Sequence, residues 1–210
     1  YLGVKSVCDS ATMEVKYTNS WASFDLEKEC AEQLIADGCV LISQHADTTG
    51  APTACEAKKV PCVGYNIDMI PTAPDAALTS ATINWGPYYT YAVQSVIEGT
   101  AIDTDWSKGV KDGADAITEL NDKTVAKGTK EKVEEAQKGI EDGTIHVFDT
   151  SKFTVGGKTL EELVESGDED ATKLQSYIKD GYFHESDVAG GMTSAPAFTF
   201  IIDGIDSITK

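Results

Sequence analysis

The residues best suited to chemistry lie just after short apolar runs of the sequence. The clearest stretch is CVLISQHADTTG, in which His45 and Asp47 follow a run of buried-type residues. An imidazole and a carboxylate so close together can act as catalysts, as metal ligands or as groups that bind a small ligand. Aromatic, amide and carboxylate residues also follow other apolar runs along the chain. The candidate site residues are Trp21, His45, Asp47, Asp68, Asn84, Trp85 and Tyr88.

Catalytic and metal-binding signatures are scarce in this sequence. It contains no GxxxxGK[ST], GxSxG, HExxH or GxGxxG motif. Each of the three histidines, His45, His146 and His184, stands without a second His or Cys at metal-ligand spacing. We therefore expect no enzyme, no metal site and no cofactor. His146 and His184 are interpreted as structural residues, whereas for His45 a ligand contact and a structural role are equally open.

The hydrophobic pattern predicts the elements that bring the candidate residues together. Strands are predicted at 13–18, 39–43, 60–65 and 78–83. Helices are predicted within 24–38, 50–59 and 86–99. Strands that alternate with helices indicate an α/β fold with a parallel sheet, in which ligands bind beyond the carboxyl ends of the strands. The candidate residues follow those ends, so we expect them to converge on one edge of the sheet.

The second half of the chain is less regular. Residues 125–143 predict a charged surface helix that leads into a strand, TIHVF. The Gly-Gly pair in FTVGGKTL predicts a hairpin turn, and ESGDEDATK is interpreted as an acidic loop. The segment APAFTFIIDGI predicts a closing strand and turn.

Composition excludes several functional classes. The chain has 35 acidic and 17 basic residues, a net charge of −18, and every basic residue is a lysine. Arginine suits phosphate and guanine recognition best, and a strongly negative protein repels a polyanion, so nucleic acid is not an expected partner. The apolar runs are far shorter than the ~20 residues of a membrane span. The five cysteines cannot all pair within one chain, and we interpret them as structural thiols.

The ordered motifs TNSW, FDLEKE, AEQLIADGCVLISQHADTTG, CVGYNIDM, APDAALTS and INWGPYY resemble the basic membrane protein (BMP) family. These are purine nucleoside receptor-like lipoproteins that serve ABC importers as substrate-binding proteins. The likeness runs from about Gly3 to Trp106 and continues more loosely to the end of the chain. It implies a periplasmic-binding-protein type I fold, in which two lobes with Rossmann-like parallel sheets close about a hinge around a purine nucleoside or related base.

The resemblance also carries expectations about organisation and partners. It implies a chain that lacks most of the first lobe, with residues 1–83 as the α/β core of the second lobe. Residues 84–210 then hold the hinge, the segments that return to the first lobe, and the remaining strands and helices. The implied partners are a small-molecule ligand and an ABC importer permease. The full-length protein is expected to be extracytoplasmic, with a lipid anchor that is absent from this chain.

The resemblance gives the candidate residues provisional roles. A purine needs aromatic plates and a few polar groups, so Trp21 is expected to stack on the base, or else to cover the core. Asp68 is expected to accept hydrogen bonds from ribose hydroxyls, or else to cap a helix. His45 and Asp47 are assigned to base or sugar edges. Asn84, Trp85 and Tyr88 are placed at the hinge and helix start, where they serve closure.

Two other classes remain open on the sequence alone. A ligand-sensing regulator of the same fold needs a DNA-binding or membrane module, and neither is visible in this chain. An enzyme of nucleoside metabolism needs a base or nucleophile in the crevice.

Overall fold

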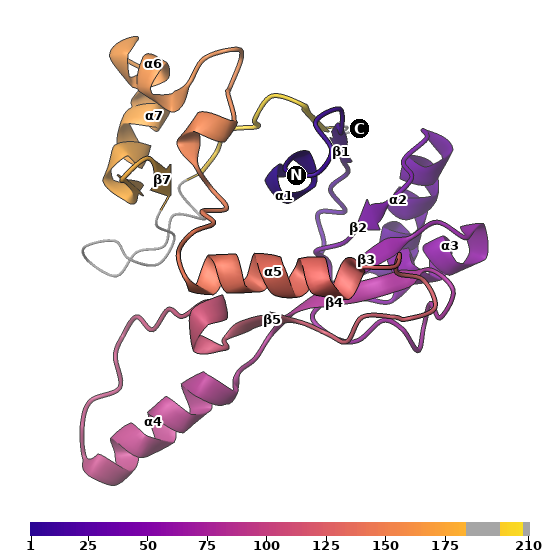
Figure 1. Ribbon diagram of the computed structural model, residues 1–210, viewed down its shortest axis with the longest axis horizontal. Coiled ribbons are helices and arrows are strands. Elements are labelled where there is room, and N and C mark those ends of the chain that lie inside the picture. Colours follow the sequence, from indigo (N-terminus) through magenta and orange to yellow (C-terminus); the bar gives the residue numbers. More distant parts are fainter. Residues whose placement is uncertain (184–197, 208–210) are drawn as a thin grey trace. The chain divides into compact units, whose positions relative to one another are not determined.

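The computed structural model describes residues 1–183 and 198–207, which form two compact units. The sheet unit comprises Lys16–Tyr91 and Gly109–Lys138. The terminal unit comprises Tyr1–Val15, Ala92–Lys108 and Gly139–Ser207. Among the described residues the chain passes between the units after Val15 and after Lys108, and also within helices α4 (Gly86–Glu98) and α5 (Thr129–Glu141), which Figure 1 labels. No helix among the described residues has the length and apolar character to span a bilayer.

The sheet unit is built on a four-stranded sheet in the order β2-β3-β4-β5. Strands β2 (Ile42–Ser43), β3 (Cys62–Tyr65) and β4 (Ala77–Ile83) are parallel, as the alternating pattern predicts. Strand β5 (Asp115–Ile117) adds an antiparallel edge to β4, and the short helix η1 (Val110–Asp112) precedes it. Because β2, β3 and β4 are parallel, their carboxyl ends lie at one edge of the sheet.

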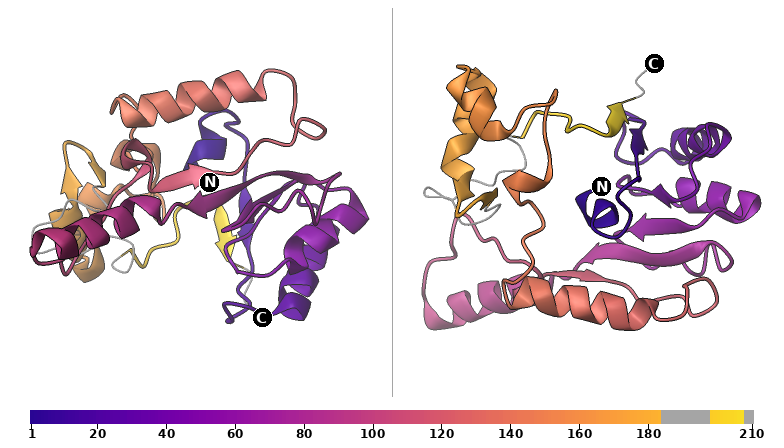
Figure 2. Two further views of the ribbon diagram at one scale, coloured as in Figure 1. Left: turned by 90° about the horizontal axis from the view of Figure 1, so that it is seen from below. Right: turned by 45° about the horizontal axis from the view of Figure 1, so that its top comes forward.

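Helices α2 (Phe24–Ala36) and α3 (Gly50–Lys58) lie side by side against this sheet (Figure 2). Their shared core consists largely of small side chains, among them Ala31, Ala54, Cys55 and Cys62, which allow close approach of helix and strand. Cys55 and Cys62 are buried thiols, and a hydrogen bond between them raises the pKa of Cys55 and lowers the pKa of Cys62. Cysteine here acts as a small core residue, as expected.

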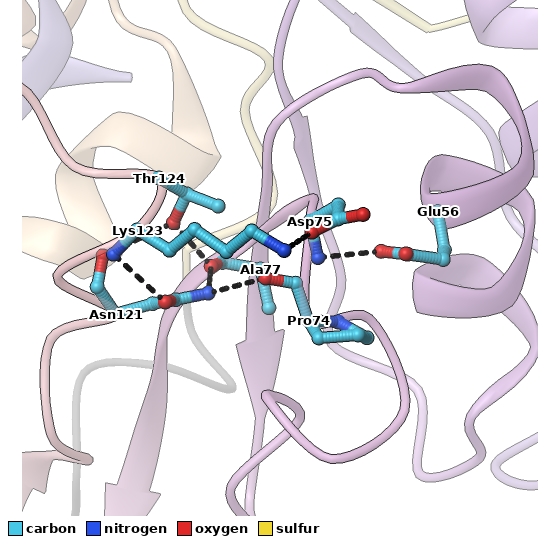
Figure 3. Close-up of polar contacts among 7 residues, drawn as sticks. All are labelled: Glu56, Pro74, Asp75, Ala77, Asn121, Lys123 and Thr124. Atoms are coloured by element: carbon cyan, nitrogen blue, oxygen red, sulfur yellow. Dashed lines mark hydrogen bonds and ion pairs between the residues drawn. The ribbon is translucent and has the colours of Figure 1, made fainter.

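A polar network fastens the segment after β5 to the start of β4 (Figure 3). The buried Asn121 amide donates to the carbonyls of Pro74 at 3.0 Å and Ala77 at 2.8 Å. The Thr124 hydroxyl donates to the same Ala77 carbonyl, and Lys123 pairs with Asp75. These bonds fix the antiparallel edge, which the sequence pattern did not predict.

The prediction that residues 13–83 form one parallel sheet is wrong at its first strand. Strand β1 (Met13–Val15) pairs in parallel with β8 (Ile205–Ser207) in a separate two-stranded sheet of the terminal unit. The strand ends after three residues. The Lys16 side chain that follows it donates to the side-chain oxygen of Gln33 in α2 at 2.7 Å. The chain enters the sheet unit at Lys16, and Asn19 in the connection to α2 has a φ of 51°.

The terminal unit contains short elements around a second core that includes Phe153, Leu160, Leu174 and Phe183. Its other elements are α1 (Leu2–Lys5), η2 (Thr150–Lys152), α6 (Leu160–Glu165), α7 (Glu169–Leu174), η3 (Gln175–Tyr177), β6 (Ile178–Lys179) and β7 (Tyr182–Phe183). Strands β6 and β7 form a hairpin.

Four sequence predictions fall in the terminal unit with different outcomes. The turn at Gly156 and Gly157 is confirmed, because both have positive φ and Val155 bridges Lys158 across them. The acidic segment 165–173 is not a loop, because most of it forms α7, with the Asp168 side chain capping the amides of Asp170 and Ala171. TIHVF is not a strand. The closing segment 195–205 lies partly outside the described residues, and its described part is not a strand until β8 begins at Ile205.

Candidate functional site

Three aromatic rings meet at the carboxyl edge of the main sheet. The His45 ring stacks on Tyr65, with ring centroids 4.8 Å apart and planes inclined by 13°. The Trp21 ring centroid lies 6.4 Å from that of His45, and the two ring planes are inclined by 45°. We call these three residues the aromatic row. Trp21 precedes α2, His45 follows β2, and Tyr65 ends β3, so three connections of the sheet unit build it.

The aromatic row is accessible to solvent. Trp21 has 74% of its surface exposed, His45 is also exposed, and Tyr65 is half-buried. Burial of a large aromatic side chain usually stabilises a protein. Trp21 is mostly exposed, so it does not serve to cover the core. Exposed rings that lie together at the ligand-binding edge of an α/β sheet can stack on a planar ligand.

Hydrogen bonds of the backbone and of a side-chain amide hold the connections that carry the aromatic row. The Asp47 amide donates to the Trp21 carbonyl at 2.8 Å, which joins the first connection to the second. The Gln44 side-chain amide donates to the carbonyls of Ala46 at 2.7 Å and Thr48 at 2.9 Å, so the QHADTT segment folds around it. The Asp47 side chain is exposed beside the row. His45 and Asp47 therefore lie in a segment with defined geometry.

Asp68 has a local structural contact. Its exposed carboxylate accepts a hydrogen bond from the Ile70 amide at 2.9 Å, in the turn that follows β3. Helix capping is the alternative that the sequence left open for Asp68, but no helix begins at this turn. The bond uses Oδ1, and a carboxylate has further acceptor sites, so a role in binding hydroxyl groups stays a prediction.

Asn84, Trp85 and Tyr88 form a separate group at the start of α4. The Asn84 amide donates to the Gly113 carbonyl at 2.9 Å and its oxygen accepts from the Gly86 amide at 3.0 Å. Asn84 thus fixes the first turn of α4 to the segment before β5. The Trp85 ring lies 6.2 Å from Tyr89, and the Tyr88 ring lies 5.9 Å from Tyr89.

Sequence reasoning missed two residues of this site. Tyr65 was assigned to strand 60–65, although the last residue of a strand already belongs to the ligand-binding edge. Glu27 lies in the predicted helix 24–38 without any sequence signal for burial, yet it is buried between α2 and the QHADTT segment. The ring stacking and the burial both depend on tertiary packing, and the only signal for either residue is the position of Tyr65 at the end of a predicted strand.

The terminal unit contains a pocket of about 470 Å³, and none of the predicted site residues lines it. There the His146 ring stacks on Tyr182, with centroids 3.6 Å apart. Two polar residues of this pocket already form hydrogen bonds within the protein. Thr150 donates to the Gly181 carbonyl, and Asp149 accepts from Ser151. The Ser151 bonds hold the pKa of Asp149 below its usual value. His146 is thus packed on an aromatic ring, and His184 lies outside the described residues.

Two curated relatives are similar to most of this chain. One is a purine-binding protein of Brucella abortus (strain 2308), 31% identical over 70% of this chain and 41% of its own length. The other, from Haloferax volcanii, is named as an ABC transporter glucose-binding protein and is 29% identical over 72% of this chain and 39% of its own length. The chain thus spans about two-fifths of the length of these relatives.

Solved structures share the fold of this chain at low sequence identity. An ABC transporter solute-binding protein of Conexibacter woesei matches with a TM-score of 0.54 and 20% identity, over 69% of this chain and 49% of that one. A solute-binding protein of Aeropyrum pernix matches with a TM-score of 0.56 and 15% identity, over 81% of this chain and 56% of that one. A transcriptional activator of the comK gene from Bacillus halodurans matches with a TM-score of 0.56 and 17% identity, over 62% of this chain and 47% of that one.

These likenesses confirm the predicted α/β fold class. The family resemblance is confirmed independently, because residues 1–149 match the Bmp family, described as ABC transporter substrate-binding protein PnrA-like. The matched residues include the whole aromatic row and the parallel strands that carry it. This chain belongs to the Bmp family of PnrA-like ABC transporter substrate-binding proteins.

Proposed function

We propose that this chain is part of an extracytoplasmic substrate-binding protein of an ABC importer and that its ligand is a purine nucleobase or nucleoside. The observation that carries the ligand class is the aromatic row at the carboxyl edge of the sheet. A purine presents two flat π faces, and offset or tilted stacking on several rings stabilises such a molecule more than an isolated ring does. The printed function of the Brucella relative, purine binding, supports the same class.

The proposed roles of the site residues follow from their chemistry and position. Trp21 stacks on the base, while His45 and Asp47 bind polar edges of the base or sugar. Asp68 accepts hydrogen bonds from ribose hydroxyls with the part of its carboxylate that the Ile70 amide does not occupy. Asn84, Trp85 and Tyr88 act at the start of α4, where they take part in closure around the ligand.

The proposed partners follow from the family. A substrate-binding protein delivers its ligand to an ABC importer permease, and the resemblance to lipoproteins supports a lipid anchor in a longer form of the protein. The net charge of −18 leaves an anionic surface, which repels nucleic acid.

A calorimetric ligand panel tests the proposal on the 210-residue chain. Adenine, adenosine and glucose are titrated separately, with glucose included because one relative is named for it. We expect saturable heat with adenine and adenosine and none with glucose. Binding of glucose without binding of either purine would replace the ligand class, and the absence of binding to all three would remove the proposed site.

A further inference from the structure

Glu27 is a buried charged residue that bonds to two of the connections that carry the aromatic row. It lies in the first turns of α2 and has only 3% of its surface exposed. Removing a carboxylate from water costs free energy unless hydrogen bonds replace its hydration. The buried Glu27 carboxylate therefore needs hydrogen-bond donors. The donors that the structure shows belong to connections that carry the aromatic row.

The Glu27 carboxylate joins two of these connections. Oε1 accepts from the Ser23 amide at 3.1 Å, two residues after Trp21. Oε2 accepts from the Thr48 amide at 3.2 Å and from the Thr48 hydroxyl at 2.7 Å, three residues after His45. Each oxygen thus serves a different connection, and a negative charge near the amino end of α2 is additionally favoured by the helix dipole.

Close packing of α3 on α2 brings Thr48 to this carboxylate. A Cβ added at Gly50 would overlap the Phe24 carbonyl oxygen and lie 3.0 Å from the Cβ of Glu27. Only glycine fits here without displacement of α3. The Gly50 amide donates to the Thr48 hydroxyl at 3.1 Å, which orients the hydroxyl proton toward Glu27.

We propose that Glu27 is a positioning residue that sets the spacing between Trp21 and His45 and thereby the ligand affinity of the aromatic row. The inference rests on the proposed function of that row, and Glu27 itself acts through Ser23 and Thr48 rather than on the ligand. The geometry requires a carboxylate. All three partners are donors, so a glutamine of the same size would present its NH₂ group to one of them and lose that connection.

The test compares Glu27→Gln with Glu29→Gln in the 210-residue chain. Glu29 is an exposed residue of the same helix that bonds to Gln33, so its variant removes the same charge without touching the row. Hydrogen exchange without ligand reports on residues 18–23 and 44–49, and calorimetry reports the affinity for adenine. We expect faster exchange in both segments and about tenfold to hundredfold weaker adenine binding for Glu27→Gln, with Glu29→Gln matching the wild type.

Several results would overturn the assignment. Unchanged exchange in the two segments would show that Glu27 does not hold them. Unchanged adenine affinity despite faster exchange would show that the spacing is irrelevant to binding. A uniform rise of exchange throughout the sheet unit would indicate general destabilisation instead of positioning.

A second pair of variants covers the case in which Glu27→Gln does not fold. Thr48→Val removes the hydroxyl donor, and Thr48→Ser retains it. The proposal expects loss of adenine affinity for Thr48→Val and near wild-type affinity for Thr48→Ser, and equal affinities would overturn it. If the wild-type chain binds neither adenine nor adenosine, the proposed function fails, while the exchange data alone still decide whether Glu27 fixes the two segments.

Discussion

At the scale of single residues, Trp21 contributes little to the core and is available for binding. We predict that Trp21→Ala weakens adenine and adenosine binding together, because the π face is common to both ligands. Stacking of a base on an aromatic side chain contributes about 1–3 kcal/mol, so the expected loss is roughly 5- to 140-fold. Calorimetry measures the affinities, and thermal unfolding without ligand is expected to change little because the ring is exposed.

The control for this prediction is Tyr17→Ala, which removes another exposed aromatic ring from the same connection but outside the row. It is expected to bind both ligands as the wild type does. A large loss of thermal stability in Trp21→Ala with unchanged affinity would assign Trp21 to the core instead.

Asp68 makes a different prediction, because its proposed partners are ribose hydroxyls. Asp68→Ala is expected to weaken adenosine binding by about 1.5–3 kcal/mol for each bond lost, while adenine binding stays unchanged. Asp68→Asn serves as the control, because it keeps an oxygen that accepts from the Ile70 amide while it removes the charge. Equal losses for adenine and adenosine in competition titrations would refute the ribose assignment and direct attention to His45 and Asp47.

The sequence predicted part of this site for a clear physical reason. Parallel strands place their following residues on one edge, so His45 could be located there without knowledge of its neighbours. Its stacking on Tyr65 and the burial of Glu27 depend on how α3 packs against α2. A sequence pattern specifies which face of a helix is apolar, but it does not show that a carboxylate on that helix is covered by another segment.

At the scale of elements, the contact of α2 with α3 at Gly50 is expected to be sensitive to one methyl group. We predict that Gly50→Ala lowers the free energy of unfolding by about 1–3 kcal/mol, because the added Cβ meets backbone that cannot move alone. Urea unfolding measures the change. Gly3→Ala, where a Cβ would meet no atom within 4 Å, is expected to be neutral. Equal effects of the two substitutions would contradict the close packing.

Local pattern predicted the helices and the parallel strands but not the non-local pairings. The spacing of apolar residues specifies α2 and α3, whereas β1 pairs with β8 almost two hundred residues away. TIHVF has the alternation of a strand, but the amides of Thr144 and Ile145 both donate to the Gly139 carbonyl at the end of α5. Those donors are therefore used to close a helix and are not available to a sheet.

At the scale of the whole molecule, fold and function must be argued separately. The fold of this chain is shared by solute-binding proteins and by a transcriptional activator, so the architecture alone does not identify an activity. Family membership supports the proposed transport role, and the aromatic row supports the proposed ligand class. The central claim is thus that a purine binds at Trp21, His45 and Tyr65.

The histidine NMR spectrum during an adenine titration tests this claim most directly. The chain has three histidines, so ¹³C-labelled imidazole gives few signals, and His45→Ala and His146→Ala assign two of them. His45 stacks within the row, while His146 lines the pocket of the terminal unit and serves as an internal control. The account predicts that ring currents of bound adenine shift the His45 signals saturably and leave His146 unchanged. A saturable shift at His146 with no change at His45 would contradict it.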